Sequence, residues 1–346
     1  MRLKQAESES RKSRWGMAAC VLLVACGSSS PKQSSATPLA PQVGEAAETR
    51  QTPRGSPLTR EAESLLQSGD APGARAKFQA ALEADPRDVR ALLGLGLASE
   101  ALDDLPSAER AYRTAIEVDP RFAEAHNNLG LLLRARGDTD QAIASLERAA
   151  REDPSLASAQ TNLALALEDA GRDEDAQRAY TRAVELAPKD AMLHANHGLF
   201  LLDRGRRDEA VDALRAGMLV AREDRAALLA LGNGLRRAGH PDEAVRALRS
   251  SIEAGDGKAT PALLAELALA QHAAKDAIGA KASLNEALRL DPKYATAAYL
   301  LGSIEAAGGD PKLAKVHFER YLVLEPRGPF AGKAKDQLAA LKKRGR

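Results

Sequence analysis

A 34-residue period is the feature of this sequence that most restricts its fold. Residue pairs that end in proline recur at this step, at Asp85-Pro86, Asp119-Pro120, Asp153-Pro154, Ala187-Pro188, Asp291-Pro292 and Glu325-Pro326. A fixed period of this length indicates stacked supersecondary units rather than independent globular domains. Counting back from each proline gives eight units, namely 55–88, 89–122, 123–156, 157–190, 191–224, 225–258, 261–294 and 295–328.

Each unit carries two helical patterns. In the third unit, apolar periodicity predicts helices over 123–136 and 139–151, with Gly137 in the turn and Pro154 after the second helix. Small residues recur where the two helices must approach closely, at Ala74, Ala108, Ala142, Ala176, Ala210, Ala244, Ala280 and Ala314. Four residues later a larger side chain follows, at Phe78, Tyr112, Leu146, Tyr180, Leu214, Leu248, Leu284 and Phe318. Only 3% of the residues are aromatic and β-branched residues are sparse, so the prediction is an all-α chain.

These features resemble the tetratricopeptide repeat family. The resemblance rests on the period, the alanines, the terminal proline and a small residue at the eighth position of most units (Gly96, Gly130, Ala164, Gly198, Gly232, Ala268 and Gly302). It covers residues 55–328 and implies a solenoid, a right-handed superhelix of about eight helix pairs whose first helices line a concave groove. Residues 329–346 are expected to form a capping helix and a basic tail. Members of the family serve many unrelated machines, so the fold does not identify the function.

The N-terminal residues resemble the export signal of a bacterial lipoprotein. A basic stretch containing Arg2, Lys4 and Arg11 precedes a short apolar run that ends in Leu23-Val24-Ala25-Cys26. The resemblance implies that 1–25 is a signal peptide and that the Cys26 thiol carries the lipid anchor. The alternatives are an apolar region that happens to contain cysteine, an uncleaved anchor, or lipid attachment at Cys20.

Residues 26–54 hold the lipidated cysteine and a segment rich in serine, proline and alanine. Such a composition buries too little apolar surface to fold, so it predicts a disordered tether. As a flexible coil its r.m.s. reach is roughly 30 Å.

The predicted groove combines asparagine and leucine. At 100° per residue, the sixth and ninth positions of each first helix lie opposite its packing side. The candidate peptide-binding residues are Asn127, Asn128, Leu131, Asn162, Leu165, Asn196, Leu199 and Asn233. An amide both donates and accepts, so a row of asparagines can bind a peptide backbone whatever its sequence, as in the asparagine ladder of other tetratricopeptide superhelices. The alternatives are that the asparagines stabilise the helix pairs and that a neighbouring unit or the tether covers the leucines.

Several classes of function find no support in the sequence. The net charge of +1 argues against a dedicated nucleic-acid binder, and two cysteines exclude a disulfide scaffold or a cysteine-rich zinc fold. His194 and His197 lie at packing positions with no third metal ligand apparent. We therefore expect no enzyme activity, no cofactor, no metal and no small-molecule substrate. The family's clamp for a C-terminal carboxylate needs lysine at the fifth position, where this chain has none.

Charge and packing differ along the repeats. Residues 55–224 have a net charge of −10, whereas 225–346 have +7 and end in Lys342-Lys343-Arg344-Gly345-Arg346. The basic end predicts either a solubilising tail or a contact with an anionic surface. Gly217 replaces an alanine and two residues are inserted before Pro261, so 217–260 is either a hinge with weaker local packing or an ordinary loop variant.

The sequence favours a membrane-tethered, non-enzymatic scaffold that binds a segment of a protein partner in its groove and assembles an envelope complex. Gly27 after the lipidated cysteine favours the outer membrane, with the protein facing the periplasm. The alternatives are a pilotin-like lipoprotein for type IV pilus secretin assembly, a substrate-recruiting subunit of an envelope enzyme, and a passive spacer.

Overall fold

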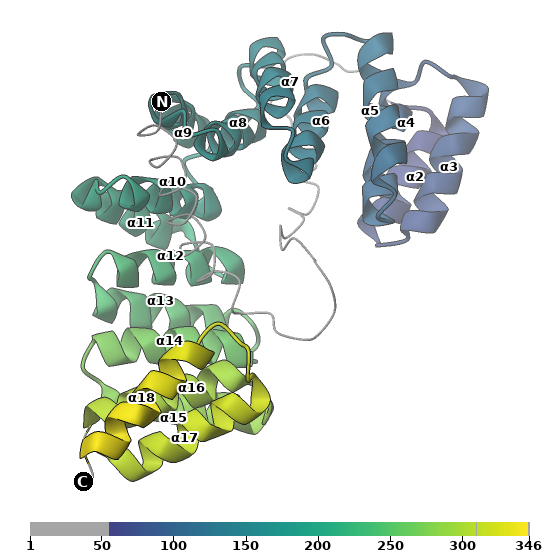
Figure 1. Ribbon diagram of the computed structural model, residues 1–346. Coiled ribbons are helices and arrows are strands. Elements are labelled where there is room, and N and C mark those ends of the chain that lie inside the picture. Colours follow the sequence, from purple (N-terminus) through teal and green to yellow (C-terminus); the bar gives the residue numbers. More distant parts are fainter. Residues whose placement is uncertain (1–54, 309, 345–346) are drawn as a thin grey trace, which may run out of the picture. The chain divides into compact units, whose positions relative to one another are not determined.

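The computed structural model describes residues 55–308 and 310–344 as antiparallel helix pairs (Figure 1). This part of the chain contains 17 helices and no strand, which confirms the predicted all-α repeat fold. None of these helices has both the length and the apolar character needed to cross a bilayer. The predicted signal peptide, Cys26 and the tether lie outside the described residues.

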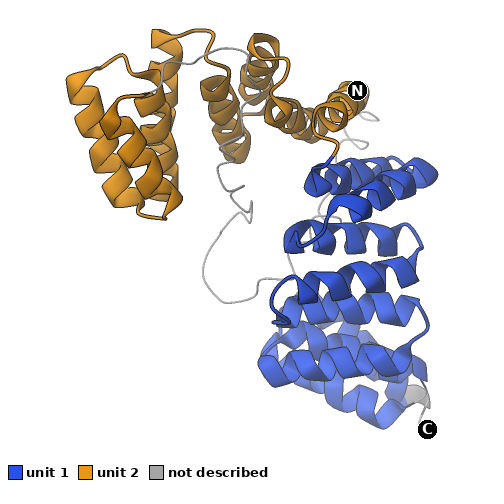
Figure 2. Cartoon of the chain, turned by 180° about the vertical axis from the view of Figure 1, so that it is seen from behind, with its two compact units in different colours: residues 1–35, 189–346 blue, residues 36–188 orange. Residues whose placement is uncertain are grey.

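The helices group into two compact units with a boundary between residues 188 and 189 (Figure 2). Unit 2 contains α2 (Pro57–Gln67), α3 (Ala71–Ala84), α4 (Val89–Ala101), α5 (Leu105–Val118), α6 (Ala123–Arg136), α7 (Thr139–Glu152), α8 (Ala157–Asp169) and α9 (Asp173–Leu186). These form four helix pairs, each made of an even-numbered first helix and an odd-numbered second helix. The bounds of α6 agree with the sequence prediction, and α7 extends one residue further than predicted.

Unit 1 continues the same alternation. It contains α10 (Ala191–Asp203), α11 (Arg207–Val220), α12 (Arg225–Arg237), α13 (Pro241–Glu253), α14 (Pro261–Ala273), α15 (Ala277–Leu290), α16 (Ala295–Gly308), α17 (Pro311–Leu324) and α18 (Ala331–Arg344). The helix expected after the eighth repeat is therefore α18, which begins two residues later than predicted.

A left-handed residue joins the two helices of a pair. The 15th position has positive φ in each repeat where the structure describes it, and glycine occupies it at Gly69, Gly137, Gly171, Gly205 and Gly239. Asp103 (φ 59°) and Lys275 (φ 65°) adopt the same conformation without being glycine. Because a Cβ atom disfavours this region, these two turns are strained relative to the others.

Aspartate caps fix where many helices begin. The Asp70, Asp104 and Asp276 side chains accept hydrogen bonds from backbone N–H groups at the start of a second helix. Asp88 does the same for the first helix α4 and also accepts a 2.7 Å bond from the Thr59 hydroxyl of α2. This carboxylate therefore both caps one helix and joins it to the preceding helix pair.

The core lies between the two helices of each pair, as the alanine pattern predicts. All eight small residues and all eight larger residues of that pattern are fully buried. The fit is close, because a Cβ atom added to Gly96 would lie 2.2 Å from the Tyr112 ring. The large Tyr112 ring of the second helix thus depends on the small residue Gly96 opposite it in the first helix.

Helix α18 covers the end of unit 1. Phe330, just before α18, stacks on Tyr299 of α16 with ring centroids 4.5 Å apart, and its N–H donates to the Tyr321 hydroxyl at 2.9 Å. Ala331 and Ala334 of α18 are buried in the same apolar cluster as Phe318. The capping helix thus completes an aromatic core that the eighth pair cannot close alone.

Part of the stretch 217–260 is closely packed. A Cβ atom on Gly217 would lie 2.6 Å from a Leu231 methyl group and 3.0 Å from the Cβ atom of His194. Leu231 and Leu235 are fully buried in a cluster that runs from α10 to α14. The close contacts at Gly217 do not show the weaker packing on which the hinge was predicted, and motion at 217–260 itself stays a prediction.

Candidate binding face on the first helices

The first helices form the inner side of each stack. In unit 2, α2 packs on α4 and α6 on α8, and in unit 1 α10, α12, α14 and α16 pack in succession. No two second helices within a unit pack to a comparable extent. We call the solvent-facing side of the first helices in each unit its inner face, and the predicted binding residues are described on that face.

Three asparagines of unit 2 are joined through their amides. Asn162 of α8 donates from Nδ2 to Asn127 Oδ1 of α6 at 2.9 Å, and Asn127 donates to Asn128 Oδ1 at 3.2 Å. Asn127 and Asn162 are only 6% and 5% exposed, whereas Asn128 is half-buried. Because a buried amide must be hydrogen-bonded, the Asn162 Nδ2 group and the Asn127 Oδ1 atom satisfy each other across the two helices. This bond joins α6 and α8, the first helices of two adjacent repeats, rather than the two helices of one pair.

Asn128 ends this chain of amides. Its Nδ2 group makes no hydrogen bond within the described residues. Leu131 and Leu165 on the same face are half-buried, so part of each side chain meets solvent. An amide donor beside two accessible leucines can bind both a backbone carbonyl and an apolar side chain of a peptide.

An ion pair borders the leucines. Arg134 Nε of α6 donates to Asp169 Oδ2 of α8 at 2.6 Å. The sixth and ninth positions alone do not reveal this pair, although Asp169 lies at the 13th position of its unit, which shares a face with the sixth and ninth. Comparing the residue at the 13th position of the fourth unit with the last turn of the preceding first helix would have identified the Arg134–Asp169 ion pair.

Asn196, Leu199 and Asn233 belong to unit 1, separate from the Asn127–Asn162 pair of unit 2. Asn196 and Leu199 on α10 and Asn233 on α12 are half-buried. The Asn233 Oδ1 atom is shielded from solvent and accepts no hydrogen bond from any residue that the structure describes.

A half-buried charge pair lies on the inner face of unit 1. Arg236 of α12 and Glu266 of α14 approach to 3.7 Å, a long distance for an ion pair. Burial raises the pKa of Glu266, and the attraction of Arg236 opposes that rise. The pair lies one turn from Asn233 and adds polarity to this face.

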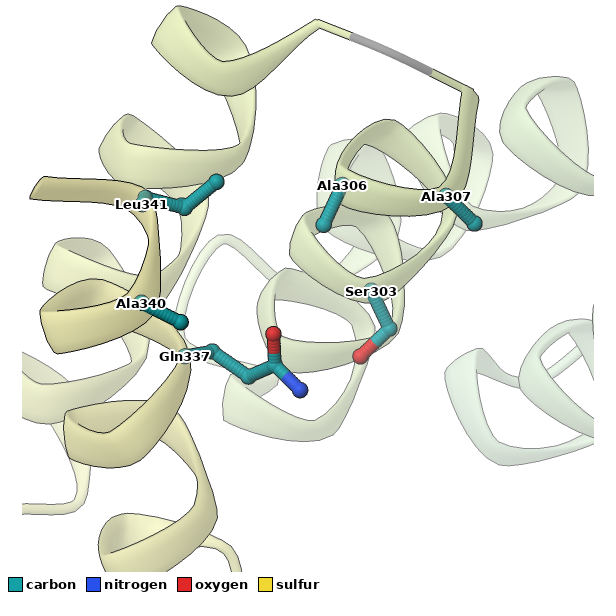
Figure 3. A pocket seen from close by; sticks show the side chains of 6 residues that line it. All are labelled: Ser303, Ala306, Ala307, Gln337, Ala340 and Leu341. Carbon is teal, nitrogen blue, oxygen red and sulfur yellow. The ribbon is translucent and has the colours of Figure 1, made fainter. Parts of the chain in front are cut away.

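Small hollows are present in unit 1 but do not resemble active sites. One, of about 260 Å³, lies between α16 and α18, where Gln337, Ala340 and Leu341 face Ser303 and Ala306 (Figure 3). Another, of about 390 Å³, is lined by Leu202, Gly205, Arg207 and Arg237. Neither brings together a nucleophile and a base.

The two neighbouring histidines of α10 pack as predicted. His194 is buried, and burial together with the charge of His194 lowers the pKa of His197 to about 4. Such an imidazole is neutral at physiological pH. Across the described residues, no group of three His, Cys, Asp or Glu side chains is placed to hold a metal ion.

Family comparisons agree with the repeat geometry. Three models, each described as tetratricopeptide repeat, match residues 59–109, 100–157 and 279–331, residues 133–197, and residues 191–216 and 225–250. Together these matches cover more than half of the chain. A comparison with curated proteins gives no match.

Solved structures are similar in fold. The crystal structure of the APC/C hetero-tetramer Cut9-Hcn1 matches with a TM-score of 0.55 and 18% identity over 82% of this chain and 55% of that chain. This chain therefore spans about half the length of its match. A Pseudomonas aeruginosa pilF structure matches at 21% identity over 62% of this chain and 97% of that chain, with a TM-score of 0.48. MamA matches at 26% identity over 47% and 95%, with a TM-score of 0.42. The first similarity concerns the fold alone, and the other two support no functional conclusion.

Proposed function

Because the chain belongs to the tetratricopeptide repeat family, whose folds serve as protein-interaction scaffolds, we propose that it is a non-enzymatic scaffold that binds a segment of a protein partner. The binding site in this proposal is the inner face of unit 2. The observation that carries it is the Asn162–Asn127–Asn128 chain of amides, which ends in a free Nδ2 donor beside Leu131 and Leu165. The segment bound there is extended, so that its carbonyls and alternate side chains meet the amide and the leucines.

The two buried asparagines have a supporting role in this proposal. Their mutual bond fixes the spacing of α6 and α8, and the bond from Asn127 orients the Asn128 amide. The ligand contacts are assigned to Asn128, Leu131 and Leu165. Asn196, Leu199 and Asn233 are assigned to a separate inner face on unit 1.

The membrane tether is the second part of the proposal. Cys26 carries the lipid, residues 27–54 are the spacer, and the repeats act in the cell envelope, at the outer membrane on its periplasmic side. This part rests on the Leu23-Val24-Ala25-Cys26 sequence and the apolar run before it. Replacement of Cys26 by serine is expected to release the protein into the soluble fraction after a carbonate wash, which removes peripheral membrane contacts. Retention of the serine variant at the membrane after a carbonate wash would contradict lipid attachment at Cys26.

Binding at the inner face is tested by crosslinked co-purification from membranes and mass spectrometry. The test variant is Asn128→Ala/Leu131→Ser in α6, and the matched control is Gln141→Ala/Arg151→Ala on the exposed side of α7. We expect a partner that is recovered with the wild type and the control to be lost from the test variant, with the circular dichroism of all three proteins alike.

The partner recovered also decides between narrower roles. A secretin subunit indicates a pilotin-like lipoprotein, and an envelope enzyme indicates a recruiting subunit. Unchanged partners in the test variant would exclude the inner face of unit 2 as the binding site and favour a spacer role.

A further inference from the structure

Val316 and Val323 are two exposed valines on the second helix of the eighth repeat. They differ from the residues that most other repeats have at the same positions of the 34-residue unit. The 22nd and 29th positions, on the second helices, are exposed in every unit. Across the other units the 22nd position holds alanine, arginine or aspartate. The 29th position holds a charged residue in all other units but the fifth, at Glu83, Glu117, Arg151, Glu185, Glu253 and Arg289. In the eighth unit the two positions are Val316 and Val323, which are 57% and 80% exposed.

The repeat fold therefore does not bury these valines. The register leaves both positions in solvent throughout the array, so their apolar character has no role in the core. They lie seven residues apart, on one side of α17, and the 46% exposed Leu313 lies at the edge of the same side. A second helix with an apolar centre on its exposed side indicates a surface that something else covers.

Positive charge surrounds the valines. Lys312 and Lys315 border them on one side, with Glu319 between the two lysines, and Arg320 lies on the other side. Lys315 and Glu319 form only a long 3.7 Å pair, and Arg320 donates one bond to the Pro292 carbonyl. Lys312 forms no ion pair within the described residues.

The basic character extends from α17 into α18, which packs against it (Figure 1). Lys333 and Lys335 of α18 are exposed. Residues 311–346 contain ten lysines and arginines but only three aspartates and glutamates. The C-terminal end of unit 1 thus combines exposed aliphatic side chains with a strong excess of positive charge.

We propose that the outward side of α17, together with the lysines of α18, docks on an anionic phospholipid surface. Val316 and Val323 enter the boundary between headgroups and acyl chains, and Lys312, Lys315 and Arg320 contact the phosphates. Charge complementarity favours lipid as the occupant. A protein interface of useful affinity normally centres on aromatic anchors in a pocket, whereas this surface presents only aliphatic side chains. The contact is distinct from partner binding on the first helices and does not require acylation of Cys26.

The test uses a local probe in the full chain. A Cys20→Ser/Cys26→Ser background removes both native cysteines, and Val323→Cys provides one thiol for an environment-sensitive fluorophore. The matched control carries the fluorophore at Arg151→Cys, the same register position in α7. We expect vesicles of phosphatidylcholine mixed with phosphatidylglycerol to shift the emission at residue 323 to the blue, and vesicles of phosphatidylcholine alone to leave it unchanged. The shift should decline with added salt, because screening weakens the attraction of exposed charges. The label at residue 151 should not respond.

Charge reversal separates this surface from general electrostatics. The loss of each positive charge is expected to weaken vesicle binding by roughly fivefold. Lys312→Glu/Lys315→Glu should have a larger effect, because each substitution also adds a negative charge. Arg246→Glu/Arg249→Glu on α13 changes the net charge equally and should leave the response at residue 323 unchanged.

Three outcomes would overturn the proposal. Absence of a shift at residue 323 with anionic vesicles would exclude lipid insertion there. Equal weakening by the two charge reversals would reduce the effect to net charge. A shift that needs only a higher protein concentration, or only polyglutamate, would assign the surface to a second copy of the chain or to an acidic protein.

Discussion

At the scale of single residues, Lys275 shows how a repeat tolerates a strained turn. It adopts φ 65° at a position where most units have glycine. We expect Lys275→Gly to stabilise the protein by about 0.5–1 kcal/mol, because the relief of the left-handed strain exceeds the added chain entropy of glycine. The measurement is the midpoint of urea unfolding.

The reverse substitution serves as the control. Gly239 has φ 86° in the corresponding turn of the preceding repeat, and nothing lies near its missing Cβ atom. Gly239→Ala should therefore destabilise the protein by about 1 kcal/mol through backbone strain alone. Equal midpoints for all three proteins would show that this turn does not contribute to stability.

A buried carboxyl group makes unit 2 sensitive to pH. Burial raises the pKa of Glu100 to about 6 from an ordinary value of 4.5, and the neighbouring Tyr112 hydroxyl opposes the rise. The folded state therefore binds this proton more tightly than the unfolded state does. Its contribution to stability is fully present below pH 4.5 and is lost as the pH rises through 6.

Glu100→Gln removes this titration. We expect the variant to be more stable than the wild type at pH 7 by at most about 2 kcal/mol, and the two proteins to be equally stable at pH 4. Urea unfolding at both pH values measures the difference. A variant that is less stable at pH 7 would show that the ionised carboxylate contributes a favourable contact.

At the scale of elements, Asp88 should contribute more than an ordinary cap. Its carboxylate accepts two backbone N–H bonds of α4 and the hydroxyl proton of the buried Thr59, whereas Asp70 accepts one N–H bond at the start of α3. We expect Asp88→Ala to lower the free energy of unfolding by about 2–3 kcal/mol and Asp70→Ala by about 1 kcal/mol. Chemical denaturation of the two variants makes the comparison. Equal losses would assign Asp88 a capping role only.

The C-terminal cap depends on one aromatic contact. Phe330 stacks on Tyr299, and its backbone N–H is held by the Tyr321 hydroxyl. Phe330→Ala should cost about 2–3 kcal/mol locally and raise hydrogen exchange in α18 first, because α18 buries few other large side chains. Unchanged exchange in α18 would show that its alanine contacts suffice.

The sequence predicts the bounds of the helices better than it predicts the exposure of single side chains. The periodic alanines and prolines place α6 at its observed bounds, because local periodicity and turn residues determine where helices begin and end. The exposure of Asn162 was not predictable in the same way. Asn128 and Asn162 share the sixth position, yet the spacing of α6 and α8 buries Asn162 against Asn127 and leaves Asn128 partly exposed. Such side-chain pairing depends on how two helices pack, which a 34-residue register does not encode.

At the scale of the whole molecule, the array should respond locally to damage. Each helix packs mainly on its neighbours along the chain. In such a protein a destabilised repeat opens without its distant neighbours. We expect Asp88→Ala to raise amide exchange in α2–α5 and to leave α14–α18 at wild-type rates, as measured by hydrogen exchange with mass spectrometry.

The same experiment tests the hinge predicted at 217–260. If amide exchange of the wild type in this stretch matches that of the flanking helices, the hinge prediction is removed. Such a match is expected for α12, since Leu231 and Leu235 are well buried.

A uniform rise of amide exchange along the entire chain in Asp88→Ala would contradict local opening and show that the repeats unfold as one cooperative body.

The self-contained caps and turns of the repeats have a consequence for how the gene can change length. A duplication that copies 34 codons inserts one helix pair and restores the register of the repeats that follow, wherever the copy begins. Insertions of other lengths are compatible only in loops between pairs. The two additional residues between α13 and α14 obey this rule, since they lie between Glu253 and Pro261 and leave both helices in register with their partners. Recombination can therefore lengthen or shorten this protein by whole repeats while the 34-residue register is kept.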